Sequence, residues 1–390
     1  MSHGHTHGPA PRATPRVRLV LTLAVVPALL VTVLGLVLLW PGAQDRVDKV
    51  PTVDEEGSYL QTEVLRVLPE AGLLEVEVDG LELAYVPPEA IAGGIAAGDE
   101  VRLLALEATQ GDGVPYVYVD HVRDLPLGLL AVVYAGMVVL VARWRGLAAL
   151  VGLGLSLALI AGFTLPALLA GYPALPVGLV TASAALFVTL YLAHGLSART
   201  TTALLGTLLG LALTAVLAGW ATGAAHLTGM TGEDSLVLPS YAPDMDLRGV
   251  VLCGIILAGL GVLNDVTITQ ASAVWELRTL APDLSRVDLF RRGMRIGRDH
   301  IASTVYTIAF AYVGAALPVM LLVSLYDQSL ASTLTAGEIA EEVVRTLVGS
   351  IGLVAAIPLT TAIAAVVVTA GPAPRADDHP ARQEPALPGS

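Results

Sequence analysis

Long apolar segments separated by short polar stretches dominate the hydropathy pattern of this 390-residue chain. An α-helix of about 20 apolar residues crosses a hydrocarbon core of about 30 Å, and each segment approaches or exceeds that length. We therefore predict an α-helical polytopic membrane protein with eight transmembrane helices, one near the N-terminus and seven later in the chain. Their predicted ranges are 17–40, 127–142, 147–169, 174–194, 201–226, 247–273, 301–325 and 344–370.

The first segment, 17–40, is preceded by arginines and closed by Trp40. It is longer than the apolar core of a signal peptide, and no small-residue cleavage site follows it. We expect a retained anchor helix whose N-terminus lies in the cytoplasm.

Residues 50–125 have a different pattern, in which apolar and polar side chains alternate over short runs such as 73–78 and 116–119. Turn residues, including Asp79-Gly80, separate these runs, as expected for β-strands. About five short strands in this length predict a small closed β-barrel of the OB kind, between the first and second helices. The domain is either a structural cap and assembly module or a surface that collects cations.

The arginines predict the orientation of the helices. They gather in alternate loops, whereas the intervening short loops carry mostly acidic residues, so the positive-inside rule places both termini in the cytoplasm. The β-domain then lies outside the cytoplasm, and the seven-helix membrane domain covers 126–370. The arginines of the predicted inner loops are Arg143, Arg145, Arg199, Arg278, Arg286, Arg291, Arg292, Arg295 and Arg298.

The two ends of the chain are polar and rich in proline, so 1–16 and 371–390 are predicted to be disordered cytoplasmic tails. The first tail contains His3, His5 and His7, whose imidazoles could converge on a transition metal. The alternative is a solvated tail or part of a purification tag.

Composition agrees with the membrane class, because 55% of the residues are hydrophobic and only 14% are charged. The net charge of −13 arises within residues 41–125, which hold 18 acidic and 5 basic side chains. No basic surface remains for nucleic acid, which we exclude as a partner. The single cysteine, Cys253, excludes an intramolecular disulfide.

A polar cluster interrupts the apolar segment 247–273 and its continuation. An acidic side chain inside a bilayer costs a few kcal/mol, so an intramembrane aspartate indicates a functional site. At 100° per residue, Asp265, Thr269, Ser272 and Glu276 share one helix face. The cluster comprises Asn264, Asp265, Thr269, Gln270, Ser272 and Glu276.

A second polar cluster begins the next helix, and its members are Asp299, His300, Ser303, Thr304 and Tyr306. A connection of about 27 residues allows the two helices to pack side by side, with Asp265 and Glu276 facing the hydroxyls. Such a polar track suits a hard or borderline cation, or a proton relay. The structural alternative is that Asp265, Glu276 and Asp299 only pair with arginines near the cytoplasmic interface.

Small residues and prolines mark the packing of the helices. Gly206 and Gly210 have the G-x-x-x-G spacing that permits close helix approach. We expect Pro166, Pro318 and Pro358 to interrupt three of the spans, which is either a transporter feature or a simple kink.

Enzyme signatures are missing from the sequence, which has no Walker loop, no His-Glu-x-x-His and no Gly-x-Ser-x-Gly. We predict that the protein is not an enzyme and uses no cofactor.

The stretches 261–272, 297–304 and 311–318 resemble the motifs of the YibE/F family of bacterial membrane proteins. The resemblance covers about 55–370 and implies an anchor, a small β-domain and a seven-helix block. It also implies that Asp265 and Asp299 occupy motif positions, but it implies no substrate.

The leading hypothesis is a secondary transporter or permease of the bacterial cytoplasmic membrane, with a small cation, such as a divalent metal, or protons as substrate. The alternative is a non-transporting assembly or signalling protein whose β-domain binds an envelope partner. The expected partners are the lipid bilayer, the small cation or proton and the envelope protein. The sequence leaves open whether the protein also forms a homo-oligomer.

Overall fold

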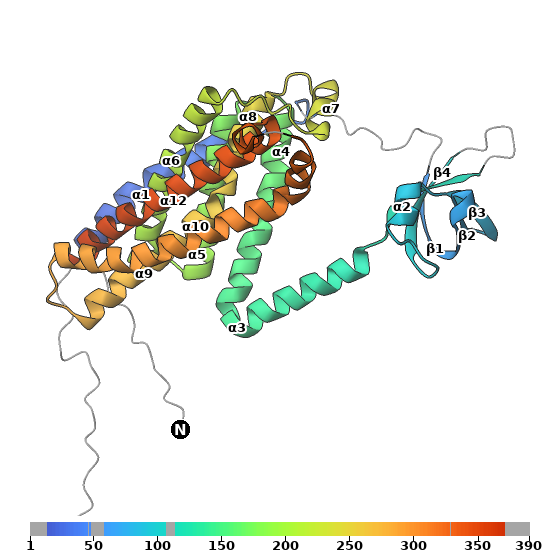
Figure 1. Cartoon of the computed structure of the whole chain (residues 1–390). Coiled ribbons are helices and arrows are strands. Elements are labelled where there is room, and N and C mark those ends of the chain that lie inside the picture. Colours follow the sequence, from blue (N-terminus) through green and yellow to red (C-terminus); the bar gives the residue numbers. More distant parts are fainter. Residues whose placement is uncertain (1–13, 46, 48–57, 107–113, 328, 371–390) are drawn as a thin grey trace, which may run out of the picture. The chain divides into compact units, whose positions relative to one another are not determined.

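The computed structural model describes residues 14–45, 47, 58–106, 114–327 and 329–370. The chain divides into two compact units (Figure 1). The barrel unit comprises Asp48–Arg143, and the helical unit comprises Met1–Val47 with Trp144–Ser390. Residues 1–13, which include His3, His5 and His7, and the whole predicted tail 371–390 lie outside the described residues. The prediction that the disordered tail extends to residue 16 is wrong, because α1 begins at Pro15.

The barrel unit contains a small closed β-barrel with the strand order β1-β2-β3-β5-β4, so the prediction of five strands in a closed barrel is confirmed. Alternate residues of the strands fill its core, among them the fully buried Val64, Leu74 and Leu103. Asp79 and Gly80 form the predicted turn and both have positive φ. The elements are β1 (Ser58–Leu68), β2 (Leu73–Glu77), β3 (Leu81–Tyr85), the short helix α2 (Pro88–Ala92), β4 (Glu100–Ala105) and β5 (Tyr116–His121).

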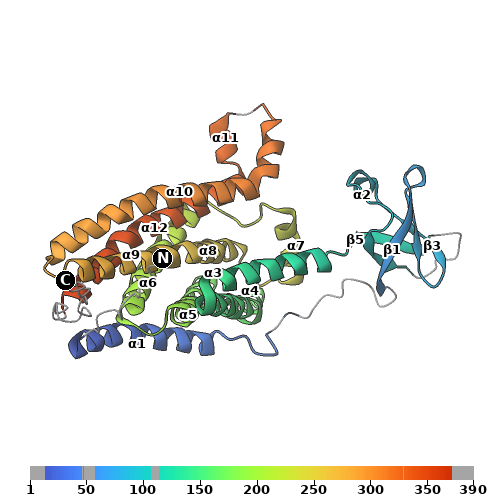
Figure 2. The same ribbon diagram turned by 90° about the horizontal axis from the view of Figure 1, so that it is seen from below.

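Helix α3 (Asp124–Leu159) joins the two units. Its backbone leaves the helical region at Arg143, with φ 55° and ψ −133°. The remaining elements belong to the helical unit, in which α1 lies along α5 (Figure 2). They are α1 (Pro15–Leu38), α4 (Leu165–Leu169), α5 (Ala174–His194), α6 (Ala198–Ala224), α7 (Glu233–Tyr241), α8 (Leu247–Ala258), α9 (Leu260–Leu280), α10 (Arg286–Ser324), α11 (Leu330–Leu334) and α12 (Gly337–Thr369).

Within the described residues, seven helices are long and apolar enough to cross a membrane. The chain is therefore a multi-pass membrane protein. The predicted segments 127–142 and 147–169 both fall within one long helical stretch, Asp124–Leu169, which bends at Arg143. The count of eight spans and the orientation of the termini stay predictions.

The predicted segment 247–273 lies within one candidate membrane span, Leu247–Leu280, in which a one-residue turn at Gly259 divides α8 from α9. The predicted connection of about 27 residues after it is wrong, since α9 continues to Leu280 and α10 begins at Arg286. Ser285 starts α10 by accepting the Asp288 N–H on its hydroxyl at 3.1 Å, so the arginines of this loop are helical.

The three prolines do not act alike. A π-helical turn at Ile160–Thr164 precedes Pro166, whose ring cannot donate the next backbone hydrogen bond. Pro318 and Pro358 lie inside α10 and α12, which continue through them. The prediction that these two prolines interrupt their spans is therefore wrong.

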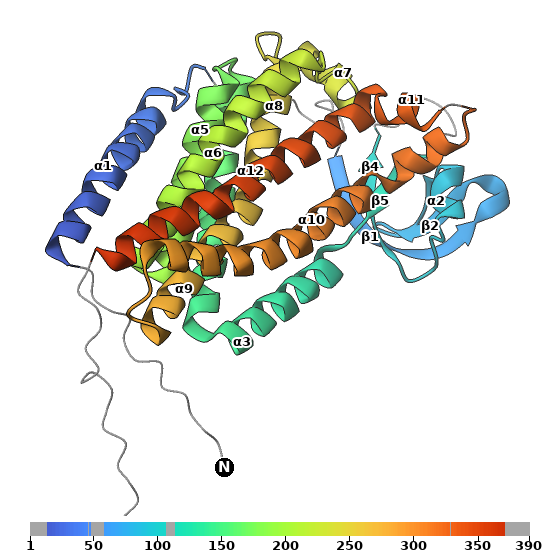
Figure 3. The same ribbon diagram turned by 60° about the vertical axis from the view of Figure 1, so that its left-hand side comes forward.

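The centre of the helical unit is the close packing of α12 against α6, α9 and α10 (Figure 3). Gly206 of α6 lies directly against Thr360, and Gly352 of α12 lies directly against Thr214. Between these contacts a Cβ on Gly210 would lie 3.0 Å from the Ala356 Cβ. The predicted role of Gly206 and Gly210 in close helix packing is confirmed by this geometry, because neither position has room for a side chain.

We expect Gly206→Ala to lower the free energy of unfolding by about 1–3 kcal/mol, since the added methyl group would overlap Thr360. Thermal unfolding of the purified protein in detergent measures the change. Gly219→Ala, on the same helix, is the matched control, because a Cβ there would have no neighbouring atom within 4 Å. Helix propensity alone would raise the stability of both variants, so an equal or higher midpoint for Gly206→Ala than for Gly219→Ala would contradict the α6–α12 contact.

Candidate functional site

The two predicted polar clusters lie on adjacent helices. Helices α9 and α10 are joined by a short turn and pack against each other as an antiparallel hairpin. Asp265 lies about 27 Å along α8 and α9 from Leu247, at 1.5 Å per residue. On the predicted orientation, this depth is toward the cytoplasmic end of the span.

Asp265 and His300 face each other across this hairpin. The His300 Nε2 atom is 4.0 Å from the Asp265 Oδ2 atom, a separation too long for a direct hydrogen bond. The Asp265 side chain is 71% exposed, whereas that of His300 is 29% exposed. The His300 Nε2 atom and the nearby Asn264 Oδ1 atom are buried without a hydrogen-bond partner. Buried polar atoms without partners are uncommon and call for an explanation.

Gln270 has a structural contact instead. Its side chain is only 2% exposed, and its Nε2 donates a hydrogen bond to the Gly293 carbonyl of α10 at 2.7 Å. A Cβ on Gly293 would lie 2.8 Å from Thr361, and a Cβ on Gly297 would lie 2.6 Å from Ile357. Glycines at these two positions therefore allow α9, α10 and α12 to meet around the amide.

A second interhelical hydrogen bond uses a residue of the same stretch that is not among the predicted site residues. The hydroxyls of Thr207 on α6 and Thr267 on α9 are 2.6 Å apart, and both side chains are fully buried. Thr267 also donates to the Leu263 carbonyl at 2.9 Å. Thr267 therefore joins two helices.

The other predicted residues lie at the surface of the described bundle. On α9, Ser272 is half-buried, and Thr269 and Glu276 are exposed. On α10, the half-buried Thr304 donates to the His300 carbonyl at 2.8 Å. The structure does not enclose these side chains in one cavity with Asp265. The exposed side chains among the predicted site residues of α9 and α10 include Thr269, Glu276, Asp299, Ser303 and Tyr306.

The expectation that Glu276 faces the hydroxyls of α10 is wrong. The contacts of Gln270 with Gly293 and of Asp265 with His300 give the antiparallel register. Glu276 then lies about 16 Å from Asp265 toward the connecting turn, whereas Tyr306 lies about 9 Å from His300 in the opposite direction. The sequence pattern describes each helix face but not this register.

Sequence reasoning missed an ionic cluster on α12. Glu341 and Glu342 lie between the predicted spans 301–325 and 344–370, but α12 already begins at Gly337. The Glu341 side chain is 8% exposed and accepts the Gly229 N–H at 3.2 Å, while Glu342 pairs with Arg345. The i, i+3 spacing of Glu342 and Arg345 was the available signal. The Glu341–Gly229 hydrogen bond joins α12 to the loop after α6, whereas the Glu342–Arg345 pair lies within α12.

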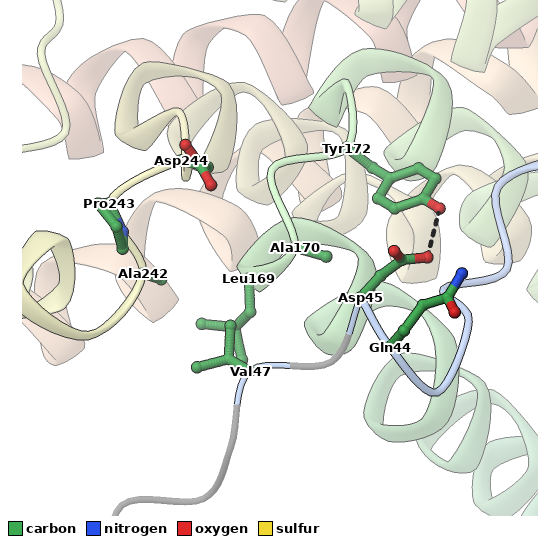
Figure 4. A pocket seen from close by; sticks show the side chains of 9 residues that line it. All are labelled: Gln44, Asp45, Val47, Leu169, Ala170, Tyr172, Ala242, Pro243 and Asp244. Atoms are coloured by element: carbon green, nitrogen blue, oxygen red, sulfur yellow. Dashed lines mark hydrogen bonds between the residues drawn. The ribbon is translucent and has the colours of Figure 1, made fainter.

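A small polar cavity of about 330 Å³ lies between the segment after α1 and the loops before α5 and α8 (Figure 4). Asp45 and Asp244 line it, and Tyr172 donates a hydrogen bond to the Asp45 carboxylate at 3.2 Å. Loss of water contact and the neighbouring Asp45 charge raise the pKa of the Tyr172 hydroxyl, which therefore remains a donor.

Metal-binding groups of three or more histidine, cysteine, aspartate or glutamate side chains are not found in the described part of the chain. The Asp265–His300 pair and the Asp45–Asp244 cavity each supply two such side chains. The predicted histidine site of the N-terminal tail lies outside the described ranges and stays untested.

A family model described as YibE/F-like protein matches residues 130–370. The match includes both polar clusters and the helices that pack around Gln270. No curated protein and no solved structure matches the chain.

We expect Gln270→Leu to lower the free energy of unfolding by about 1–3 kcal/mol, because it removes the buried side-chain hydrogen bond between α9 and α10. Thr269→Ala, an exposed neighbour on the same helix, should change it by less than about 0.5 kcal/mol. Thermal unfolding in detergent compares the two variants. An unchanged midpoint for Gln270→Leu would contradict its structural role.

Proposed function

Because the chain belongs to the YibE/F-like protein family, and its helices make it a multi-pass membrane protein, we propose that it is a secondary transporter or permease of a bacterial cytoplasmic membrane. The proposed substrate is a small cation, either a divalent metal ion or a proton. Both termini are proposed to face the cytoplasm, and the OB-like barrel the opposite side.

The observation that carries the proposal is the Asp265–His300 pair. A carboxylate and an imidazole approach to 4.0 Å at the α9–α10 contact, with a buried imidazole nitrogen that has no partner. Leaving such an atom unsatisfied costs about 1–3 kcal/mol. A bound ion, or a water between the two groups, would recover that energy. This gap is the place where a substrate would be held.

The chemistry of the pair suits two kinds of substrate. Carboxylate oxygen and neutral imidazole nitrogen together bind borderline divalent metals, with water completing the coordination shell. The same two groups can pass a proton, because an imidazole nitrogen can donate or accept one and a carboxylate oxygen can accept one. Asp265 therefore has the central role in either case, and His300 assists it.

Most of the remaining predicted residues have supporting roles in the proposed pathway. Thr269, Ser272, Asp299, Ser303, Thr304 and Tyr306 would provide a polar, water-accessible approach to the pair from the uncovered side of α9 and α10. Glu276, which lies toward the connecting turn, is outside this approach. Asp45 and Asp244, in the cavity at the other end of the helices, would concentrate cations near an outer entrance. The acidic barrel domain would act in the same way. The role is non-enzymatic.

We expect Asp265→Asn to reduce ion flux to the background of empty vesicles while leaving the unfolding midpoint nearly unchanged, since the side chain is largely exposed. Proteoliposomes loaded with metal-sensitive and pH-sensitive dyes measure uptake and efflux across a panel of divalent metals. His300→Gln should also lower flux, because it removes the imidazole nitrogen that faces Asp265.

Glu276→Gln is the matched control for this experiment. It removes an exposed carboxylate on the same helix face, about 16 Å from the pair, and should retain flux. Normal flux in a folded Asp265→Asn protein would remove Asp265 from the mechanism. A wild-type protein that carries no ion under any gradient would contradict the transport proposal itself.

A row of apolar side chains on the barrel supports the alternative function, an assembly or signalling protein that binds an envelope partner. Leu81, Leu83 and Tyr85 alternate along β3 and all point outward, with exposed fractions of 67%, 37% and 47%. Exposed apolar rows of this kind are typical of protein-binding surfaces. On this proposal, the polar residues of the helices only hold the bundle together.

We expect Leu81→Ser with Leu83→Ser to abolish recovery of a co-purifying envelope protein if this second function holds, because the pair removes the centre of the apolar row. Glu77→Ser, exposed opposite Leu81 on β2, is the control and should retain the partner. Quantitative mass spectrometry after affinity purification from cross-linked membranes measures recovery. Equal recovery from all three proteins would exclude the β3 row as the binding surface.

A further inference from the structure

A long crevice separates the N-terminal half of α1 from α5 and the start of α6. Its volume is about 920 Å³. Toward the other end of α1 the helices close up, because Gly35 lies directly against Val180 of α5. The crevice therefore opens toward the end of α1 that carries Arg16 and Arg18.

One end of the crevice is basic. Arg18 of α1 and Arg199 of α6 line it, and no acidic side chain is among its lining residues. Neither arginine forms an ion pair within the described chain. The Nε atom of Arg199 is buried and has no hydrogen-bond partner. A guanidinium group with a buried free donor is a ready site for a phosphate or carboxylate.

The backbone adds positive charge at the same end. Helix α6 starts there, and Ser197 caps it by accepting the Thr200 N–H at 3.1 Å. A helix N-terminus carries about half a positive charge and favours anions. A hydrogen bond of 3.1 Å between the Tyr191 and Thr201 hydroxyls holds α5 to α6 beside the opening. The basic end is therefore built from two tied helices and α1.

The rest of the crevice is apolar. Leu21, Val25 and Leu29 of α1 face Phe187 and Val188 of α5 along its walls. From Arg18 to Leu29 the lining extends about 16 Å along α1, at 1.5 Å per residue. This length accommodates most of one acyl chain.

We propose that the crevice binds one anionic phospholipid laterally, with its phosphate at Arg18 and Arg199 and one acyl chain between α1 and α5. Basic pockets between helices at the cytoplasmic side of a membrane bind anionic lipid head groups for this reason. A zwitterionic lipid offers the same chain but a weaker net attraction. The lipid fixes α1 to the bundle and reaches Trp275 of α9, which lines the crevice. This inference does not depend on transport.

The test compares lipid stabilisation of the full-length protein in detergent. The sole cysteine, Cys253, is buried, so a thiol-reactive dye reports its exposure on unfolding. Phosphatidylglycerol should raise the unfolding midpoint of the wild type more than phosphatidylcholine of the same acyl chains. Arg199→Gln should raise the phosphatidylglycerol concentration needed for half-saturation by about tenfold, because it weakens binding. Native mass spectrometry should count one retained phosphatidylglycerol per chain.

Three further proteins keep the result interpretable. Arg291→Gln removes an exposed arginine of α10 outside the crevice and should respond like the wild type. Val26→Trp fills the apolar part without changing charge and should lose the phosphatidylglycerol effect even if Arg199→Gln folds poorly. Val20→Trp, on the exposed side of the same helix, should keep it.

Several outcomes would overturn the proposal. Equal stabilisation by phosphatidylcholine would show that the crevice does not select an anionic head group. Equal stabilisation by inorganic phosphate would assign the basic end to a free anion instead of a lipid. A loss of response in Arg291→Gln as large as in Arg199→Gln would reduce the effect to general surface charge.

Discussion

The close approach of α6, α9, α10 and α12 is the constraint on which the helical unit depends. Helices in a bilayer gain little from burying apolar side chains against each other, because lipid tails are equally apolar, so short contacts between small residues must supply the attraction. Gly206 against Thr360 and Gly352 against Thr214 supply such contacts between α6 and α12, and Gly293 and Gly297 do so for α10. These glycines leave the polar side chains between the helices in fixed positions.

This packing separates the polar residues into two groups with different physical roles. Gln270 and Thr267 form short interhelical hydrogen bonds in buried surroundings, so their polar groups hold the helices together. Asp265 and His300 approach each other without a direct bond, beside buried atoms that have no partner. The second arrangement leaves binding capacity unused, and it is therefore the part of the polar stretch that supports a functional site.

The periphery of the bundle is held differently from its centre. The anchor helix α1 contacts α5 closely at Gly35, but a crevice with a basic end separates the helices elsewhere. An interface with a gap of this size needs another molecule to fill it, and the bilayer itself supplies lipids. The charged residues near the N-terminus of α12 have partners within the protein instead. Glu341 accepts the Gly229 N–H, and Arg345 pairs with Glu342.

The sequence by itself determined the membrane class, the apolar helices, the small barrel and the two polar clusters, because these follow from local periodicity and composition. The effect of Pro318 and Pro358 on their helices was predicted less well, since helix breaking depends on the neighbours that replace a lost hydrogen bond. Only the tertiary structure decided that Asp265 meets His300 while Glu276 lies far from Tyr306, and that Gln270 is structural. Register between helices depends on contacts between residues distant in sequence, about which the pattern along one helix contains no information.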